Sequence, residues 1–231
     1  MLETLIRPDE LRDRLETEGP VVIDCRFYLP EPERGEAEYL EGHIPGALYA
    51  HLDRDLSGPM TGKNGRHPLP IVERMMDRFS KWGIDDQTEV VVYDTAAGQI
   101  AARLWWMLRY LGHDHVALLD GALIGWTETG GSLRHGRETG VPRTFSPRPR
   151  AEMQVDVENL EGYLLIDART SERYRGENEP LDPVAGHIPG ARNNPTSANL
   201  DASGRFLPPD KLHQRFEDLI GGRSADEVVH Y

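Results

Sequence analysis

Cysteine is almost absent from this sequence: among 231 residues, only Cys25 carries a thiol. A lone cysteine has no intramolecular disulfide partner, which excludes a disulfide-stapled secreted domain and fits a reducing cytoplasm. Long apolar runs are lacking as well, because runs such as VVVY at 90–93 are far too short to cross a bilayer. Residues 1–16 show no basic region followed by an apolar stretch, so we identify no signal peptide.

Positive charge is scarce. The chain has 26 Lys and Arg against 39 Asp and Glu, which gives a formal net charge of −13. Such a surface repels nucleic acid and anionic membranes, so we expect neither as a partner. With 38% hydrophobic and 28% charged residues, the composition is that of an ordinary folded protein, and the length suits one large domain or two small ones.

The sequence repeats itself. Three blocks recur in the same order: VVID (21–24), GHIPGA (42–47) and VVVY (90–93) return as LLID (164–167), GHIPGA (186–191) and VVHY (228–231). An ordered set of repeated blocks indicates two copies of one structural unit.

Each copy alternates strand and helix patterns. The short apolar runs that end in a carboxylate are typical of buried parallel strands. Residues 70–83 and 209–222 begin with proline, carry apolar residues three or four apart and end with glycine, which predicts helices. Residues 99–113 are apolar nearly all round and predict a buried helix with Trp105 and Trp106 in the core. We therefore expect an α/β fold of tandem domains, each a parallel sheet with helices on both faces.

The domain boundaries follow from the repeat. Residues 131–150 are rich in Gly, Pro, Arg and Ser and are predicted to be a linker between a first domain, 1–130, and a second, 151–231. If the second copy matches the first, roughly 40 further residues are expected after Tyr231, so the second copy is predicted to be incomplete.

These blocks resemble the rhodanese family of sulfurtransferases. The segments ARLWWMLRYLGH (102–113) and LLDGALIGW (118–126) match as well, so the resemblance spans nearly the whole chain. It implies tandem rhodanese-like domains, the first a silent copy and the second catalytic. It also implies transfer of sulfane sulfur from thiosulfate or 3-mercaptopyruvate to cyanide or a thiol through a cysteine persulfide. No metal and no diffusible cofactor is implied.

The resemblance places the catalytic cysteine in a loop between a strand and a helix. In such a loop, backbone N–H groups and the helix dipole lower the thiol pKa. In the first copy this position holds Asp94, and in the second the cysteine is expected directly after Tyr231, so the chain as written is expected to be inactive. Cys25 stands where the second copy has Ala168, and is expected to be a buried small residue. Its neighbour Arg26 leaves residual reactivity open.

The resemblance also implies three substrate-binding residues, Arg173, Arg169 and Asp53. Arg173 matches an arginine that faces the bound sulfur donor, and Arg169 matches a second at the same strand end. A guanidinium suits a small oxyanion, although salt bridges are the structural alternative for both arginines. Asp53 lies near an acid proposed to help thiol activation in the mercaptopyruvate branch, and its alternative is a turn residue.

One departure from the family bears on the donor. Mercaptopyruvate-type members carry a further arginine nine residues after the first, and here Asp182 holds that position. The departure favours a thiosulfate-type enzyme.

Other polar residues of the repeat are predicted to be structural. His43 and His187, one in each GHIPGA block, are expected to make a repeated hydrogen bond and not to bind a metal. Asp24 and Asp167 are expected to pair with arginine or to cap nearby backbone.

Two alternatives to sulfur transfer stay open. One is a non-catalytic binding module in which both copies are silent. The other is a phosphatase, since a related fold supports that chemistry with a longer cysteine loop that contains an arginine.

Overall fold

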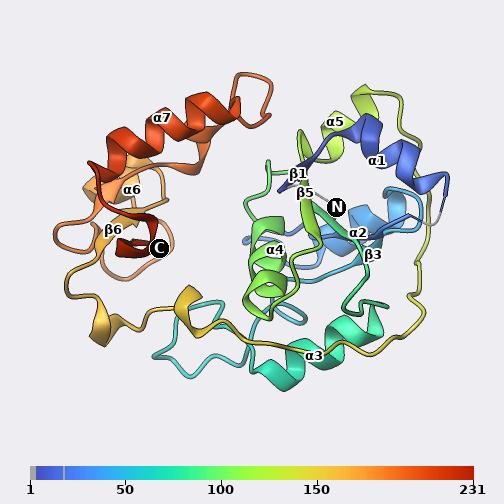
Figure 1. Ribbon diagram of the computed structural model, residues 1–231, viewed down its shortest axis with the longest axis horizontal. Helices are drawn as coiled ribbons and strands as arrows, with labels where there is room; N and C mark the ends of the chain where they lie inside the picture. The colour runs from blue at the N-terminus through green and yellow to red at the C-terminus, as the bar shows by residue number, and fades with distance from the viewer. Residues whose placement is uncertain (1–3, 18) are drawn as a thin grey trace. The chain divides into compact units, whose positions relative to one another are not determined.

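A computed structural model describes residues 4–17 and 19–231 (Figure 1). The chain divides into two compact units, Met1–Ala151 and Glu152–Tyr231. Within the described part of the chain, no helix is both long enough and apolar enough to cross a membrane.

The first unit is built on one parallel sheet. Its elements are β1 (Leu5–Ile6), α1 (Pro8–Leu15), β2 (Val21–Asp24), α2 (Arg34–Glu41), β3 (Leu48–Tyr49), α3 (Val72–Lys81), β4 (Val90–Tyr93), α4 (Ala101–Tyr110), β5 (Val116–Leu119) and α5 (Ala122–Glu128). The strand order is β1-β5-β4-β2-β3, and each neighbouring pair is parallel. Helical crossovers between parallel strands explain why the sequence alternates strand and helix patterns.

Helices cover both faces of this sheet, as predicted. On one face, Val22 and Val91 pack with Leu11 of α1 and Trp126 of α5. Because side chains alternate along a strand, the buried Val92 points to the other face of the sheet. On that face α4 lies against β4 and β5.

The helix α4 lies within the predicted range 99–113 but is not buried all round. Trp105 and Trp106 are only partly buried, so their predicted place in the core was wrong. The ring of Trp106 stacks on Tyr110 at 5.0 Å, and the Arg109 guanidinium lies over Trp105. On the outer side of a helix, large aromatic rings can reduce their exposure to water by packing on neighbouring side chains. An apolar sequence pattern does not distinguish this packing from burial in the core.

The predicted linker, residues 131–150, runs along the first unit. Arg134 forms an isolated antiparallel bridge with His43, and the ring of Phe145 is buried against that of Phe79. These contacts make the segment part of the first unit's packing.

The second unit repeats the central strands on a smaller scale. The 3-10 helix Ala151–Met153 begins at the last residue of the first unit. The strands of the second unit are β6 (Leu164–Asp167), β7 (Arg192–Asn193) and β8 (Val228–His230). Its helices are α6 (Ser171–Arg175), α7 (Pro209–Ile220) and the 3-10 helices Val157–Asn159, Thr196–Asn199 and Ala225–Glu227. The described strands form a parallel sheet in the order β7-β6-β8.

In this sheet β8 takes the place that β4 has in the first unit. The backbone N–H of Cys25, after β2, donates to the carbonyl of Tyr93 at 2.7 Å. The N–H of Ala168, after β6, donates to the carbonyl of Tyr231 at 3.0 Å. The register confirms the alignment of the repeats and makes Tyr231 the counterpart of Tyr93.

Candidate functional site

An ion pair closes the carboxyl end of the central strand in both units. Arg26 Nη2 lies 2.7 Å from an Asp24 carboxylate oxygen and donates to the carbonyl of the first GHIPGA glycine at 2.7 Å. Arg169 makes the same contacts with Asp167 and with the second GHIPGA block, both at 2.6 Å. The predicted pairing of both aspartates with arginine is confirmed. In both units the arrangement ties the end of the central strand to the GHIPGA turn.

The histidines of the two GHIPGA blocks are also structural. His43 Nδ1 lies 2.8 Å from the carbonyl of Tyr39, and the two rings stack. His187 Nδ1 lies 2.7 Å from the carbonyl of Tyr174, again with stacked rings. The predicted repeated hydrogen bond is confirmed. Across residues 4–17 and 19–231, no group of three or more His, Cys, Asp or Glu side chains is arranged to hold a metal ion.

Asp94 follows β4, and its carboxylate fills a ring of backbone donors. One oxygen accepts from the N–H groups of Ala96 and Gly98 at 2.8 and 2.9 Å. The other accepts from Ile100 and Ala101 at 2.9 and 3.0 Å, where α4 begins. The loop is therefore a cradle for an anionic group, occupied by the protein's own carboxylate.

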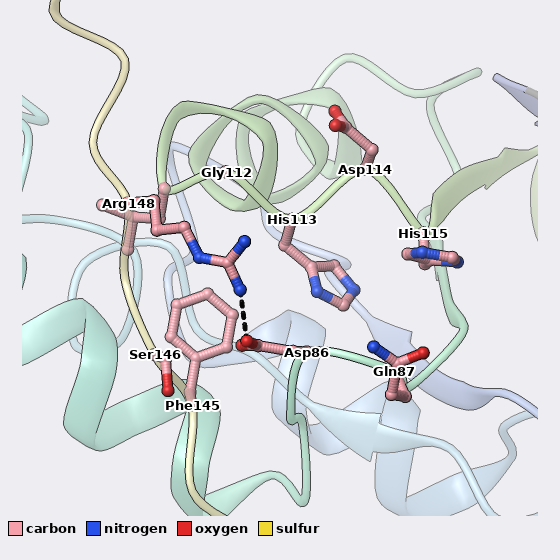
Figure 2. A pocket seen from close by; sticks show the side chains of 10 residues that line it. Asp86, Gln87, Gly112, His113, Asp114, His115, Phe145, Ser146 and Arg148 are labelled. Carbon is pink, nitrogen blue, oxygen red and sulfur yellow. Dashed lines mark hydrogen bonds and ion pairs between the residues drawn. The ribbon is translucent and has the colours of Figure 1, made fainter.

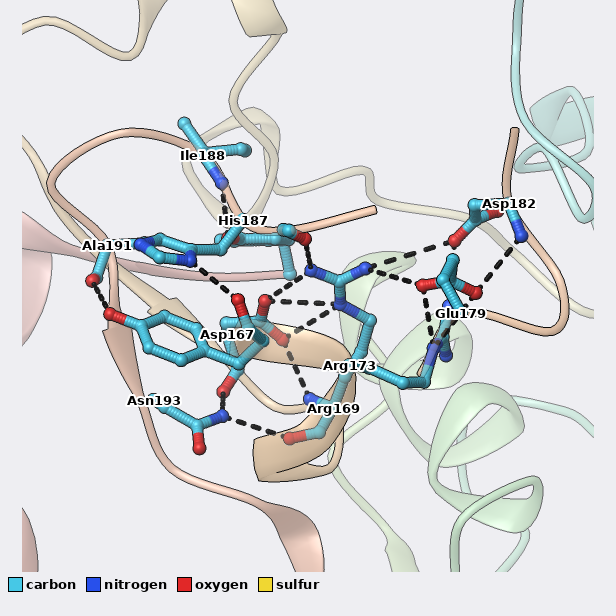
Figure 3. A network of polar contacts seen from close by, with 12 residues as sticks. Asp167, Arg169, Arg173, Glu179, Asp182, His187, Ile188, Ala191 and Asn193 are labelled. Carbon is cyan, nitrogen blue, oxygen red and sulfur yellow. Dashed lines mark hydrogen bonds and ion pairs between the residues drawn. The ribbon is translucent and has the colours of Figure 1, made fainter. Parts of the chain in front are cut away.

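The structure brings two predicted site residues, Arg173 and Arg169, together at the carboxyl end of β6 (Figure 3). Arg173 Nε lies 3.0 Å from Glu179 Oε2, and Arg173 Nη2 lies 2.7 Å from an Asp182 oxygen. Arg169 Nη1 lies 3.4 Å from Glu179. Both acids come from the loop 176–185, so the positive charge of the two arginines is offset within the chain.

Glu179 is firmly held, and nothing in the sequence marked it. Its side chain is 4% exposed, and it also accepts the N–H groups of Leu181 and Asp182, both at 3.0 Å. Hydrogen bonds from Arg173, together with these N–H groups, lower the pKa of Glu179 to about 2, although desolvation opposes them. Glu179 therefore stays ionised at any physiological pH.

A hollow of about 360 Å³ opens beside this network in the second unit. The lining residues are Arg169, Asp182, Val184, Ala185, Gly186, His187, Ile188 and Tyr231. The hollow lies at the carboxyl ends of β6 and β8, the end at which parallel α/β sheets bind their ligands.

Asp53, the third predicted site residue, belongs to the first unit and pairs with His67. Its Oδ1 lies 3.0 Å from His67 Nε2. Burial lowers the pKa of His67, although the charge of Asp53 opposes the shift. The carbonyl of His67 accepts a hydrogen bond from Arg103, which fixes the loop. His67 escaped prediction because two polar loop residues far apart in sequence carry no pattern.

Another hollow, of about 240 Å³, lies in the first unit at the amino ends of strands β4 and β5 (Figure 2). It is lined by residues that precede β4 and β5, such as Gln87, His113 and His115. Arg148 and Asp86 form an ion pair across its rim. Because it faces the amino ends of the strands, we assign it no part in the candidate site.

Comparison with known proteins agrees with this geometry. Residues 7–129 match the Rhodanese-like domain family. A probable 3-mercaptopyruvate sulfurtransferase of Pseudomonas aeruginosa is 45% identical over 98% of this chain and 83% of its own length. The putative thiosulfate sulfurtransferase SseB of Mycobacterium tuberculosis is 37% identical over 94% of this chain and 78% of its own.

Solved structures show the same fold. SseA of Escherichia coli, described as a 3-mercaptopyruvate sulfotransferase with the rhodanese fold, matches with a TM-score of 0.83 and 29% identity, over 99% of this chain and 88% of that one. The 3-mercaptopyruvate sulfurtransferase from Leishmania major matches with a TM-score of 0.87 over 99% of this chain and 65% of that one. At 24% identity, this second match speaks for the fold alone.

These findings define an α/β protein of tandem rhodanese-fold units. The chain belongs to the rhodanese family, and its homologues are sulfurtransferases.

Proposed function

We propose that this chain belongs to an enzyme that moves sulfane sulfur from thiosulfate or 3-mercaptopyruvate to cyanide or a thiol through a cysteine persulfide. The observation that carries the proposal is the equivalence of Tyr231 and Tyr93 in the two sheets. The residue after Tyr93 is Asp94, which sits in the anion cradle. The persulfide cysteine is accordingly expected directly after Tyr231.

The Asp94 loop supports this chemistry because its backbone N–H groups bind a carboxylate. Four N–H groups that stabilise one anionic side chain would equally stabilise a thiolate and its persulfide in the second copy. The thiolate attacks the outer sulfur of thiosulfate, the sulfur–sulfur bond breaks, and sulfite leaves with the electron pair. Cyanide or a thiolate then takes the outer sulfur and the cysteine leaves as a thiolate, so no further oxidant or reductant is required.

The arginines of the second unit receive unequal roles. We propose that Arg173 binds the anionic donor. Arg173 stands directly before Tyr174, and the equivalent position before Tyr39 in the first unit holds Glu38. Arg169 repeats the contacts of Arg26, so its role in donor binding is secondary. A net charge of −13 favours small molecules over nucleic acid or membranes as partners, and a single thiol fits the cytoplasm as the site of action.

Residues 1–231 alone are expected to transfer no sulfur from thiosulfate to cyanide. Cys25 is their only thiol, it is 0% exposed, and desolvation together with nearby carboxylates raises its pKa. Thiocyanate formation, measured on this chain and on the product of the gene's full reading frame, tests the proposal. We expect transfer by the full product only, and no change on Cys25→Ser.

Two outcomes would contradict this assignment. Transfer by residues 1–231 would make Cys25 the nucleophile. Absence of transfer by a folded full product, with either donor, would favour a non-catalytic binding module.

Replacing His67 with glutamine in the full product is expected to lower kcat/KM for sulfur transfer about 100-fold, a typical loss for a general base. We propose that the Asp53–His67 pair helps to activate a thiol during transfer, because Asp53 resembles the acid given that role in the family and lies 3.0 Å from His67 Nε2. Steady-state kinetics with His135→Gln, an exposed histidine of the same unit, provides the control. Equal activity of both variants would remove His67 from the mechanism.

A further inference from the structure

The loop 176–185 distinguishes the second unit from the first. His43 follows Tyr39 by four positions, whereas His187 follows Tyr174 by thirteen. The first unit forms its Asp–Arg pair, its stacked Tyr–His pair and its GHIPGA turn without such a loop. The acids of the loop are therefore not required by the fold.

The loop meets a cation that the first copy lacks. Arg173 stands directly before Tyr174, while the residue before Tyr39 is Glu38. The Arg173 side chain is 17% exposed and is held by Glu179 and Asp182 (Figure 3).

The two acids differ in how firmly they are held. Glu179 is 4% exposed and is anchored by backbone N–H groups as well as by Arg173. Asp182 is 34% exposed; its carboxylate lies 2.7 Å from Arg173 Nη2 and 3.9 Å from Arg169 Nη1. Asp182 also lines the hollow of about 360 Å³, so its negative charge faces an anion in the hollow, while its carboxylate holds Arg173.

The charges of this network disfavour a highly charged ligand. Two guanidinium groups, of Arg169 and Arg173, face three carboxylates, of Asp167, Glu179 and Asp182. A ligand that displaces Asp182 from Arg173 still lies near its negative charge. Because Coulomb repulsion scales with the charge of the ligand, a dianion is penalised about twice as much as a monoanion.

We propose that Asp182 is a specificity-determining residue that makes the Arg173 site discriminate against dianionic sulfur donors in favour of monoanionic ones. The proposal rests on the proposed function for the kind of ligand. It would favour a 2-oxo carboxylate such as 3-mercaptopyruvate over thiosulfate. In the sequence analysis, Asp182 in place of an arginine favoured thiosulfate as the donor. The negative charge of Asp182 in the structure instead disfavours thiosulfate.

The test is anion binding to the chain of residues 1–231, measured by isothermal titration calorimetry at low salt. Thiosulfate is the dianionic probe and pyruvate the monoanionic one. The nearly isosteric change Asp182→Asn is expected to lower the Kd of thiosulfate about tenfold and that of pyruvate about threefold, as expected when one charge near a partly exposed cation is removed. Both gains should shrink as NaCl is added, because salt screens exposed charges.

A matched control lies in the same loop. Glu177→Gln makes the same charge change, but Glu177 pairs with Arg175, both contacts at 2.8 Å. We expect this variant to bind both probes like the native chain, and the double variant Asp182→Asn/Arg173→Met to lose the gain. Asp182→Ser repeats the test with a smaller side chain.

Several results would overturn the proposal. They are equal gains for the two probes, equal effects of Asp182→Asn and Glu177→Gln, or no binding by the Asp182→Asn chain. These results can be distinguished from failure of the proposed function. In that case the full product transfers no sulfur, but the Asp182→Asn chain still gains more affinity for thiosulfate than for pyruvate.

Discussion

Replacing Asp94 with alanine is expected to lower the free energy of unfolding of the first unit by about 3–5 kcal/mol. Asp94 is 1% exposed, and its carboxylate accepts hydrogen bonds from four backbone N–H groups. A buried donor left without a partner costs about 1–3 kcal/mol, and partial relaxation of the loop keeps the total below the sum. Asp94→Asn keeps one acceptor oxygen but turns an NH2 donor toward the other two N–H groups, so it should destabilise the unit as well.

The measurement is guanidinium unfolding followed by tryptophan fluorescence. The tryptophans of the chain, Trp82, Trp105, Trp106 and Trp126, all lie in the first unit, so the signal reports on that unit. Asp13→Ala, an exposed change on α1, should leave the midpoint where it is. If Asp94→Ala unfolds at the same denaturant concentration as Asp13→Ala, the carboxylate does not hold the loop.

The repeat explains why so much of the fold was predictable. A duplicated sequence forms the same hydrogen bonds twice, so the roles of Asp24 and His43 in one copy identify those of Asp167 and His187 in the other. Apolar runs that end in aspartate could be assigned to parallel strands because both faces of such a sheet are buried.

The parts of the site that escaped prediction lie where the copies differ. Glu179 belongs to a loop without a counterpart, and its role depends on the tertiary position of Arg173. His67 and Asp53 meet through a polar loop whose path no periodicity specifies. Pairs formed by irregular backbone have no sequence pattern, so only the structure identifies them.

Replacing Arg26 with methionine is expected to destabilise the first unit by about 3–5 kcal/mol, the usual cost of leaving one partner of a buried ion pair alone. The side chains of Arg26 and Asp24 are 5% and 0% exposed. Tryptophan fluorescence during guanidinium unfolding measures the loss. Arg34→Met, which removes an exposed pair with Glu38, should leave the midpoint unchanged.

The same variant should make the stability of the first unit depend on pH. Burial already raises the pKa of Asp24 above its ordinary value, and the hydrogen bonds and charge of Arg26 oppose that shift. Without Arg26 the folded-state pKa rises further, so the native state binds a proton that the unfolded state releases. A raised carboxyl pKa stabilises at low pH and the benefit is lost as pH rises, so Arg26→Met should unfold at a higher denaturant concentration at pH 5.5 than at pH 7.5. The same pH difference in the native chain would show that Arg26 does not control this carboxyl group.

The equivalent change in the second unit, Arg169→Met, separates structure from donor binding. Arg169 is 21% exposed, so the loss of stability should be smaller than for Arg26→Met, and the tryptophan signal should not move. Unfolding of the second unit is then followed by NMR signals of Tyr174 and Tyr231. Because Arg169 repeats the contacts of Arg26, a folded Arg169→Met chain is expected to keep most of its affinity for thiosulfate, while Arg173→Met loses it. The opposite ranking would assign the anion to Arg169 and leave Arg173 as the counter-ion of Glu179.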